Sequence, residues 1–176
     1  MSPISSRPRD RSGDAWRGER GESLAELALV LPMLMLVLFG LIELGNAFTV
    51  SHALATISRE GANIASRGTP FTDVLRVVVD NADELQLDVR GGSVASQITI
   101  EGGVPRVTRQ LATPGYETRS LIGLRDSVAT DLSSVGFFEG STHYVVEVFY
   151  GYESITPLAN FLAGVIPDPI YEKAIF

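Results

Sequence analysis

The stretch Gly21-Glu22-Ser23-Leu24-Ala25-Glu26 leads directly into a segment without charged residues that extends from Leu27 to Ile42. Its leucine, valine, isoleucine and phenylalanine side chains each favour transfer into a bilayer by about 0.3 to 0.6 kcal/mol, roughly 3 to 6 kcal/mol in all. Glu26 and Glu43 flank the segment, where a carboxylate costs less than the roughly 2.5 to 3.5 kcal/mol it costs at mid-membrane. A helix from Leu24 to Leu44 would be about 31 Å long, close to the thickness of the hydrocarbon layer. The sequence therefore predicts one membrane span.

Charge predicts the orientation of that span. The first 21 residues hold five arginines and three acidic residues. The positive-inside rule therefore places this leader in the cytoplasm and exports the rest of the chain. The remainder holds 9 basic and 18 acidic residues, a formal charge of -9. Such acidity argues against nucleic acid as a partner, because phosphate binding needs a basic patch.

A stripe of small or apolar residues continues beyond the predicted span. Its members recur at helical spacings of three and four: Gly40, Glu43, Ala47, Val50, Leu54, Ile57, Gly61 and Ile64. Two interpretations remain open. The stripe packs on the chain's own exported domain, or it forms a helix–helix interface between subunits, since small residues let membrane helices approach closely. In the second interpretation Glu43 would also avoid lipid.

Two prolines bear on the long helix. Pro32 lies inside the span and removes one backbone hydrogen bond, which predicts a kink near that residue. Pro70, in Gly68-Thr69-Pro70, predicts the end of the helix near Arg67. The expected organisation is a cytoplasmic leader over residues 1–21, a transmembrane and extended helix over 22–67, and an exported domain over 68–176.

The exported part is predicted to form a small α+β domain, with an antiparallel sheet and two or three short helices. Hydrophobic periodicity predicts helices at Phe71–Asp83, Leu121–Val135 and Thr156–Val165, and strands at Leu85–Val89, Ser96–Ile100, Val104–Leu111, His143–Tyr152 and Ile170–Phe176. Glycine pairs such as Gly102-Gly103 suit hairpin turns. Pro105 lacks a ladder donor, which places its strand at an edge. The strand from His143 is expected to be central.

Catalytic chemistry is not indicated, so an enzyme is not expected. The two histidines, His52 and His143, have no acid or nucleophile at a spacing that suggests a site. The chain has no cysteine, which excludes disulfides and thiolate metal sites. A cluster of Asp80, Asp83, Glu84 and Asp88 lacks the acid pattern and central glycine of a calcium loop, so a solvated helix end is the default and calcium the alternative. No cofactor or metal is predicted.

The N-terminal block resembles the TadE-like family, minor pilins or pseudopilins of the tight-adherence (Flp) pilus. The matching motifs are Arg20-Gly21, Glu26, Leu29-Val30-Leu31-Pro32, Gly40-Leu41-Ile42-Glu43-Leu44-Gly45 and Arg59-Glu60-Gly61-Ala62. A weaker likeness extends to Tyr150, Tyr152 and Thr156-Pro157-Leu158, and the firm match covers about a third of the chain.

The resemblance implies a structural or assembly subunit of a pilus system for adhesion or secretion. It implies that a prepilin peptidase cuts after Gly21 in the cytoplasm, which leaves Glu22 as the new amino terminus and Glu26 as the fifth residue. Glu26 would then neutralise the terminal amine of a neighbouring subunit. The expected location is the bacterial inner membrane, single-pass, with the domain in the periplasm or on a surface pilus, and the expected partners are other pilins and assembly proteins.

Two other functions stay open. A secreted soluble binding domain would use the apolar run as a Sec signal peptide, cut after Gly45-Asn46-Ala47, although the run is longer than the usual signal core. A membrane-tethered hydrolase or ligand-binding module rests only on the acidic cluster and on the aromatic strand, the predicted strand that holds Tyr144, Phe149, Tyr150 and Tyr152. Membrane extraction with carbonate separates the anchored form from the secreted one.

Overall fold

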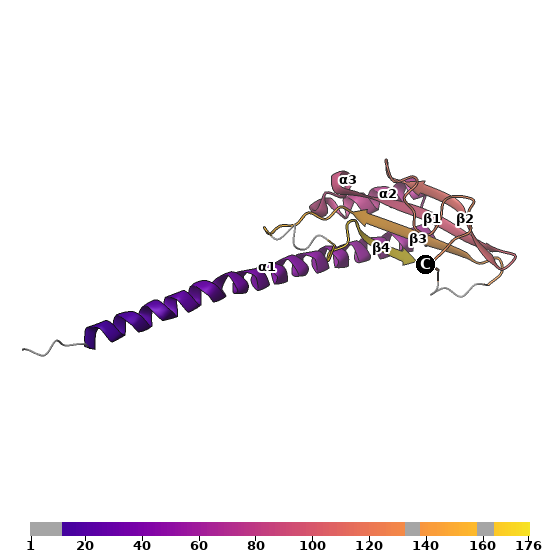
Figure 1. Cartoon of the computed structure of the whole chain (residues 1–176). Coiled ribbons are helices and arrows are strands. Elements are labelled where there is room, and N and C mark those ends of the chain that lie inside the picture. The colour runs from indigo at the N-terminus through magenta and orange to yellow at the C-terminus, as the bar shows by residue number, and fades with distance from the viewer. Residues whose placement is uncertain (1–11, 133–137, 158–163) are drawn as a thin grey trace, which may run out of the picture.

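The protein forms a long helical rod joined to a small sheet domain, seen in a computed structural model that describes residues 12–132, 138–157 and 164–176 (Figure 1). The elements are α1 (Ser12–Ser66), α2 (Phe71–Asp80), the 3₁₀ helix η1 (Asp83–Leu85), α3 (Leu87–Arg90), β1 (Gly91–Glu101), β2 (Val104–Ala112), β3 (Thr142–Tyr150) and β4 (Ile170–Ile175). The predicted α+β class is confirmed. The long helix ends at Ser66, one residue before the predicted position, but begins at Ser12 rather than near Leu24.

The four strands form one antiparallel sheet in the order β2-β1-β3-β4. The strand predicted from His143 is β3, and it is central as expected. Pro105 lies in β2, an edge strand, which confirms the placement that its missing donor required. Gly102 and Gly103 form the β1–β2 turn with φ angles of 60° and 75°, a conformation that glycine adopts without strain.

One face of the sheet is covered by helices. The C-terminal half of α1 and the amphipathic α2 pack on it, with Leu54, Val74 and Val146 fully buried between them. Side chains of β3 alternate between the two faces, so Val146 and Val148 meet the helices. Because this half of α1 lies against the sheet, the helix and the domain form one packed unit.

The opposite face is covered by an extended loop instead of the helix predicted at Leu121–Val135. That prediction was wrong for the described part, residues 121–132: Leu121 and Leu124 are exposed, whereas Ile122 and Ala129 are buried with Val107. The loop follows β2 through backbone bonds, including Val107 N–H to Ser127 O at 3.0 Å. Positive φ angles at Gly123 and Asp126 also interrupt helical geometry.

A buried carboxylate ties this loop to the sheet. Glu147 of β3 has no exposed surface, and it accepts hydrogen bonds from Ser120 Oγ at 2.6 Å, Leu121 N at 2.8 Å and Tyr171 Oη at 2.9 Å. Buried polar groups remain stable only when they are bonded in this way. The position of the loop therefore depends on a partner far away in the sequence.

Two further sequence predictions differ from the structure or fall outside it. The segment Leu85–Val89 is not a strand but the junction of η1 and α3, where Gln86 has a φ of 53°. Its alternation was misleading because Val89 is 78% exposed and only Leu87 is fully buried. Of the helix predicted at Thr156–Val165, residues 158–163 lie outside the described residues.

Tyr171 should make the domain sensitive to alkali. Burial, and next the negative charge of Glu147, raise the pKa of Tyr171 above its ordinary value of 10.0. A raised pKa in the folded state means that the stabilisation is complete below pH 10 and is lost as pH rises above it. We expect the free energy of unfolding to fall more steeply above pH 10 in the wild type than in Tyr171→Phe, by up to about 1.4 kcal/mol per pH unit. Denaturant unfolding across this range is the measurement, and equal slopes would contradict the expectation.

Candidate functional site

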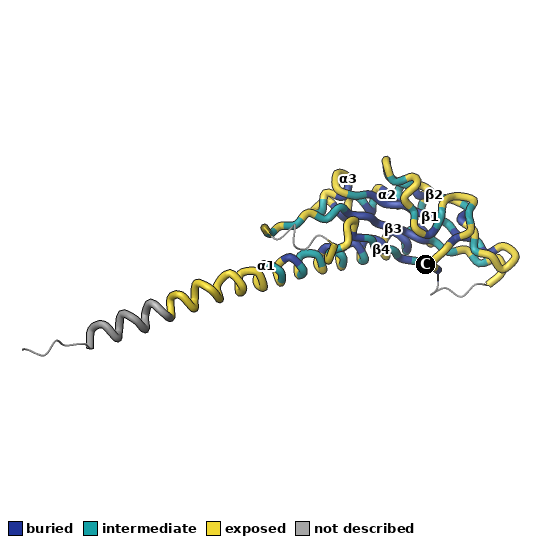
Figure 2. The backbone as a smooth tube through the Cα atoms, in the orientation of Figure 1, coloured by how far each residue is buried: buried dark blue, intermediate teal, exposed yellow. Residues whose placement is uncertain are grey.

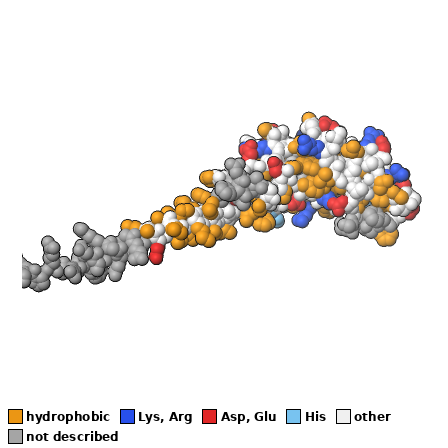
Figure 3. Space-filling view, viewed as in Figure 1, with side chains coloured by type: hydrophobic (Ala, Val, Ile, Leu, Met, Phe, Trp, Pro, Cys, Tyr) orange, Lys and Arg blue, Asp and Glu red, His pale blue; other side chains and the backbone are white. Residues whose placement is uncertain are grey.

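The N-terminal part of α1 presents apolar side chains to its surroundings on all sides. These side chains are 44% to 80% exposed: Leu24, Leu27, Leu29, Val30, Leu31, Met33, Leu34, Met35, Leu36, Val37, Leu38, Leu41 and Ile42. Figure 2 shows most of this portion of the rod as exposed, and Figure 3 shows hydrophobic atoms along its visible face. Among the described residues, one helix is long and apolar enough to cross a membrane, and it is this one. Exposed apolar surfaces of this extent mark sites of contact with other proteins or with a membrane.

The residues expected to take part in processing lie at the start of this surface. Gly21 and Glu22 are within α1, and Glu26 is exposed on it. Pro32 also lies inside α1, which continues on both sides of it. The cleavage at Gly21, the role of Glu26 and the kink at Pro32 stay predictions.

Glu43 lies where the rod meets the domain, and its carboxylate is completely buried. It accepts hydrogen bonds from Tyr152 Oη at 2.7 Å, Ile155 N at 3.1 Å and Thr156 N at 2.9 Å. Asn46, one turn further along α1, donates to the same Tyr152 oxygen at 3.0 Å. We call Glu43, Asn46, Tyr152, Ile155 and Thr156 the Glu43 clasp.

The strand β3 delivers the clasp loop to α1. After β3, Gly151 N donates to Arg90 O at 2.7 Å, and Tyr152 then reaches the helix. Burial, and next the hydrogen bond to Glu43, raise the pKa of Tyr152, so its hydroxyl stays protonated as a donor. The ion pair Arg90–Glu153 at 3.0 Å adds an exposed contact that contributes little. The clasp thus satisfies a carboxylate that would be costly at a lipid boundary.

The chain's own domain covers much of the stripe predicted on α1. Val50, Leu54, Ile57 and Gly61 are buried against α2, β3 and β4, and Ile64 is partly buried there. A Cβ added at Gly61 would lie 2.7 Å from Val78 Cγ2. This half of the stripe is therefore buried within the chain, as the intrachain interpretation expects, and its part in a subunit interface stays a prediction.

The other end of the stripe is more open. Among the described residues, a Cβ added at Gly40 would meet no atom within 4 Å, and Ala47 is half-buried. Ala47 lines an apolar groove of about 470 Å³ between α1 and the segment before and at the start of β4. The wall on α1 is Leu44, Ala47, Phe48 and Ser51, and the opposite wall is Val165, Ile166, Pro167, Pro169, Ile170, Tyr171 and Glu172.

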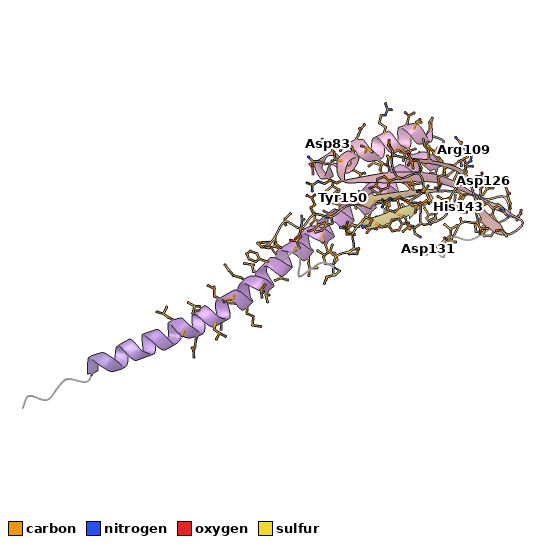
Figure 4. All side chains as sticks on the ribbon, turned by 45° about the horizontal axis from the view of Figure 1, so that its top comes forward. Asp83, Arg109, Asp126, Asp131, His143 and Tyr150 are labelled. Carbon is orange, nitrogen blue, oxygen red and sulfur yellow. The ribbon has the colours of Figure 1, made fainter. Side chains whose placement is uncertain are left out.

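Ionisable side chains do not gather into a catalytic or metal centre in the parts of the chain that the structure describes. No group of three or more His, Cys, Asp or Glu side chains there could hold a metal ion. Figure 4 shows the labelled Asp83 at one end of the domain and the labelled Asp126 and His143 toward the other end. His52 is exposed on α1, and His143 Nε2 lies 3.1 Å from Ser141 Oγ.

Sequence reasoning missed the partner of Glu43. It placed Glu43 on the stripe and Tyr152 on the aromatic strand, but these residues are separated by 109 positions. The available signal was a single carboxylate at the end of an apolar run, which needs a donor. Nothing in the local pattern identified which donor that would be.

Comparison with known proteins agrees with the resemblance noted from the motifs. The family described as TadE-like protein matches residues 21–63. No curated protein and no solved structure matches the chain. The match starts at Gly21, includes the apolar segment and Glu43, and ends before α2. Residues 21–63, from the expected processing site through most of the stripe, are thus similar to the TadE-like family.

Proposed function

We propose that the protein is a membrane-anchored structural or assembly subunit of a Tad (Flp) pilus system. The observation that carries this proposal is a TadE-like rod whose first half is apolar and exposed and whose second half is packed into a domain. The TadE-like family is a structural pilus component, which favours this role over an enzyme. A rod of this kind holds an exported domain at a defined position relative to the membrane.

The proposed topology has the N-terminus in the cytoplasm and the sheet domain in the periplasm. The basic leader and the acidic exported part support this orientation. Cleavage by a prepilin peptidase after Gly21 would expose the amine of Glu22 four residues before Glu26. The intact mass of membrane-extracted protein tests the cleavage, since an intact Met1 or Ser2 terminus would contradict it.

Association with other subunits is proposed to use the open end of the stripe, at Gly40 and Ala47. We expect Gly40→Leu to impair pilus formation, because small residues permit the close approach of membrane helices. Overpacking a close contact costs about 1 to 3 kcal/mol, which corresponds to roughly fivefold to hundredfold weaker association. The measurement is the number of pili per cell by electron microscopy, together with the amount of the variant in the membrane fraction.

Gly45→Leu is a matched control for Gly40→Leu. Among the described residues, a Cβ at either glycine would meet no atom within 4 Å, so the first side-chain carbon of either leucine meets no steric conflict there. The two positions differ by about 140° around the helix, and Gly45 lies off the stripe. Normal piliation in Gly40→Leu, or equal loss in both variants, would count against an interface on this stripe.

The secreted alternative conflicts with the geometry at the clasp. Cleavage after Ala47 would remove Glu43 and leave Tyr152 Oη, Ile155 N and Thr156 N without the carboxylate that accepts their hydrogen bonds. It would also remove two residues of the α1 wall of the groove, Leu44 and Ala47. Carbonate extraction tests the choice, because an anchored chain stays with the membrane whereas a secreted one is released.

A further inference from the structure

We propose that the end of the domain nearest the rod is a membrane-contacting collar, which seats the domain on the lipid surface. The collar consists of Phe48 on α1, Ile155 in the clasp loop, and Val165, Ile166 and Pro167 before β4. Its partner is the interfacial layer of the bilayer that holds α1. This inference rests on the proposed membrane anchoring and adds a second contact to it.

Depth along α1 supports this partner. If the hydrocarbon layer ends near Leu44, Phe48 lies about 6 Å beyond it, at 1.5 Å per residue. The headgroup layer on each side of a bilayer is about 5 to 7 Å thick. Phe48 is 74% exposed although it lies beside the sheet domain. The groove that it lines with Leu44 and Ala47 therefore starts at the lipid boundary.

The exposed apolar residues of two loops lie at the same end of the molecule. Ile155 and Val165 are 63% and 62% exposed. Ile155 N is bonded to Glu43, one residue from the end of the predicted span, and Val165 lines the groove with Leu44. Figure 1 shows the chain after β3 running toward the free part of the rod. These side chains thus surround α1 where it leaves the membrane.

Polarity changes along the groove in the direction expected for an interface. Its end farther from the span holds Ser51 and Glu172, whose side chains share a hydrogen bond of 2.5 Å. Ser51 lies about 10 Å beyond Leu44 along the helix, past the headgroup layer. The groove is therefore apolar where lipid would lie and polar where water would lie.

The contact is expected to depend on apolar burial rather than on charge. Residues 152–157 and 164–169 include two acidic and no basic residues. Anionic lipids attract basic segments, so these loops offer them no electrostatic attraction. Binding of the collar should therefore change little with salt and should occur on zwitterionic lipid.

Tryptophan fluorescence of the full chain in vesicles tests this proposal. Trp16 is the only tryptophan in the sequence, so a Trp16→Phe background isolates one probe. Phe48→Trp places the probe in the collar. Phe138→Trp is a matched control, since Phe138 is 76% exposed and directly precedes the turn at Glu139 and Gly140, where Glu139 accepts hydrogen bonds from Gly102 N and Gly103 N of the β1–β2 hairpin. The vesicles are phosphatidylcholine with or without bromine near the carboxyl end of the acyl chains.

We expect brominated lipid to quench the Phe48→Trp probe about twofold or more relative to the Phe138→Trp probe, because the depth of residue 48 matches the interface. Val165→Trp should behave like Phe48→Trp. Weak quenching of the collar probe, equal to that of the control probe, would refute the collar. If the chain nevertheless remains in the membrane after carbonate washing, the proposed membrane anchoring is still supported. Shielding of the collar probe from aqueous iodide without quenching by lipid would indicate a second copy in the groove and would also refute the collar. Release of the chain by carbonate would instead refute the anchor.

Discussion

Gly61→Leu is expected to lower the free energy of unfolding by about 3 kcal/mol, the upper part of the usual range for overpacking a core. A Cβ alone at this position would lie 2.7 Å from Val78 Cγ2 and 3.3 Å from Val146 Cγ1. Leucine adds three more carbon atoms at a point where α1, α2 and β3 meet. Denaturant unfolding of the full chain in detergent micelles, followed by near-ultraviolet circular dichroism of the domain, measures the effect.

Gly45→Leu is the control, because it makes the same change in α1 at a point where a Cβ would meet no atom of the described part of the chain within 4 Å. Leucine favours the helix over glycine by up to about 1 kcal/mol, so the free energy of unfolding of this variant should equal or slightly exceed that of the wild type. Equal stabilities of the two variants would show that Gly61 is not closely packed. A piliation defect in Gly61→Leu alone would therefore report a damaged domain rather than a lost subunit contact, which is why Gly40 is the cleaner test of assembly.

The strongest sequence patterns predicted the elements that depend on local or periodic information. The apolar segment from Leu27 predicted the exposed half of α1, and Pro70 predicted its end. The alternation in β3 predicted a central strand, because both of its sides carry large apolar residues. Gly102-Gly103 predicted the hairpin turn for a stereochemical reason that no tertiary contact alters.

The elements that were mispredicted depend on distant partners. Leu121, Leu124 and Val128 have helical spacing, yet the loop that holds them is fixed by Glu147 and by β2. The three alternating apolar residues from Leu85 are compatible with a strand and with a short helical junction, so their spacing could not distinguish between the two. The burial of Leu87 in the core against the sheet determines the conformation of this segment instead.

The sequence predicted which residues form the candidate site, but it did not predict which segments of the chain contact them. Glu43 and the stripe were identified from spacing, but spacing along one helix cannot show whether another segment of the same chain or another subunit covers it. The structure buries Leu54 and Gly61 within the chain, whereas Gly40 is half-buried and Phe48 is exposed. A long helix thus combines intrachain packing at one end with exposed surface at the other.

Glu43→Ala is expected to open the clasp, with about hundredfold faster hydrogen exchange at the amides of Ile155 and Thr156. Both amides donate to the buried carboxylate, and hydrogen bonds to charged groups contribute about 1.5 to 3 kcal/mol each. A loss of about 2.7 kcal/mol in the local opening free energy corresponds to that hundredfold change. Hydrogen exchange followed by mass spectrometry, on the full chain in detergent micelles or nanodiscs, provides the measurement.

Glu172→Ala is the matched control for Glu43→Ala, since it removes the other carboxylate that binds α1, through Ser51 Oγ at 2.5 Å. It should leave exchange at Ile155 and Thr156 unchanged. Glu43→Ala should still insert, because it removes a carboxylate near lipid and leaves the apolar segment intact. If Glu43 instead served a neighbouring subunit, exchange at these amides would not change in the isolated chain, whereas piliation would fall. Exchange and piliation together therefore distinguish a clasp within the chain from a contact between subunits.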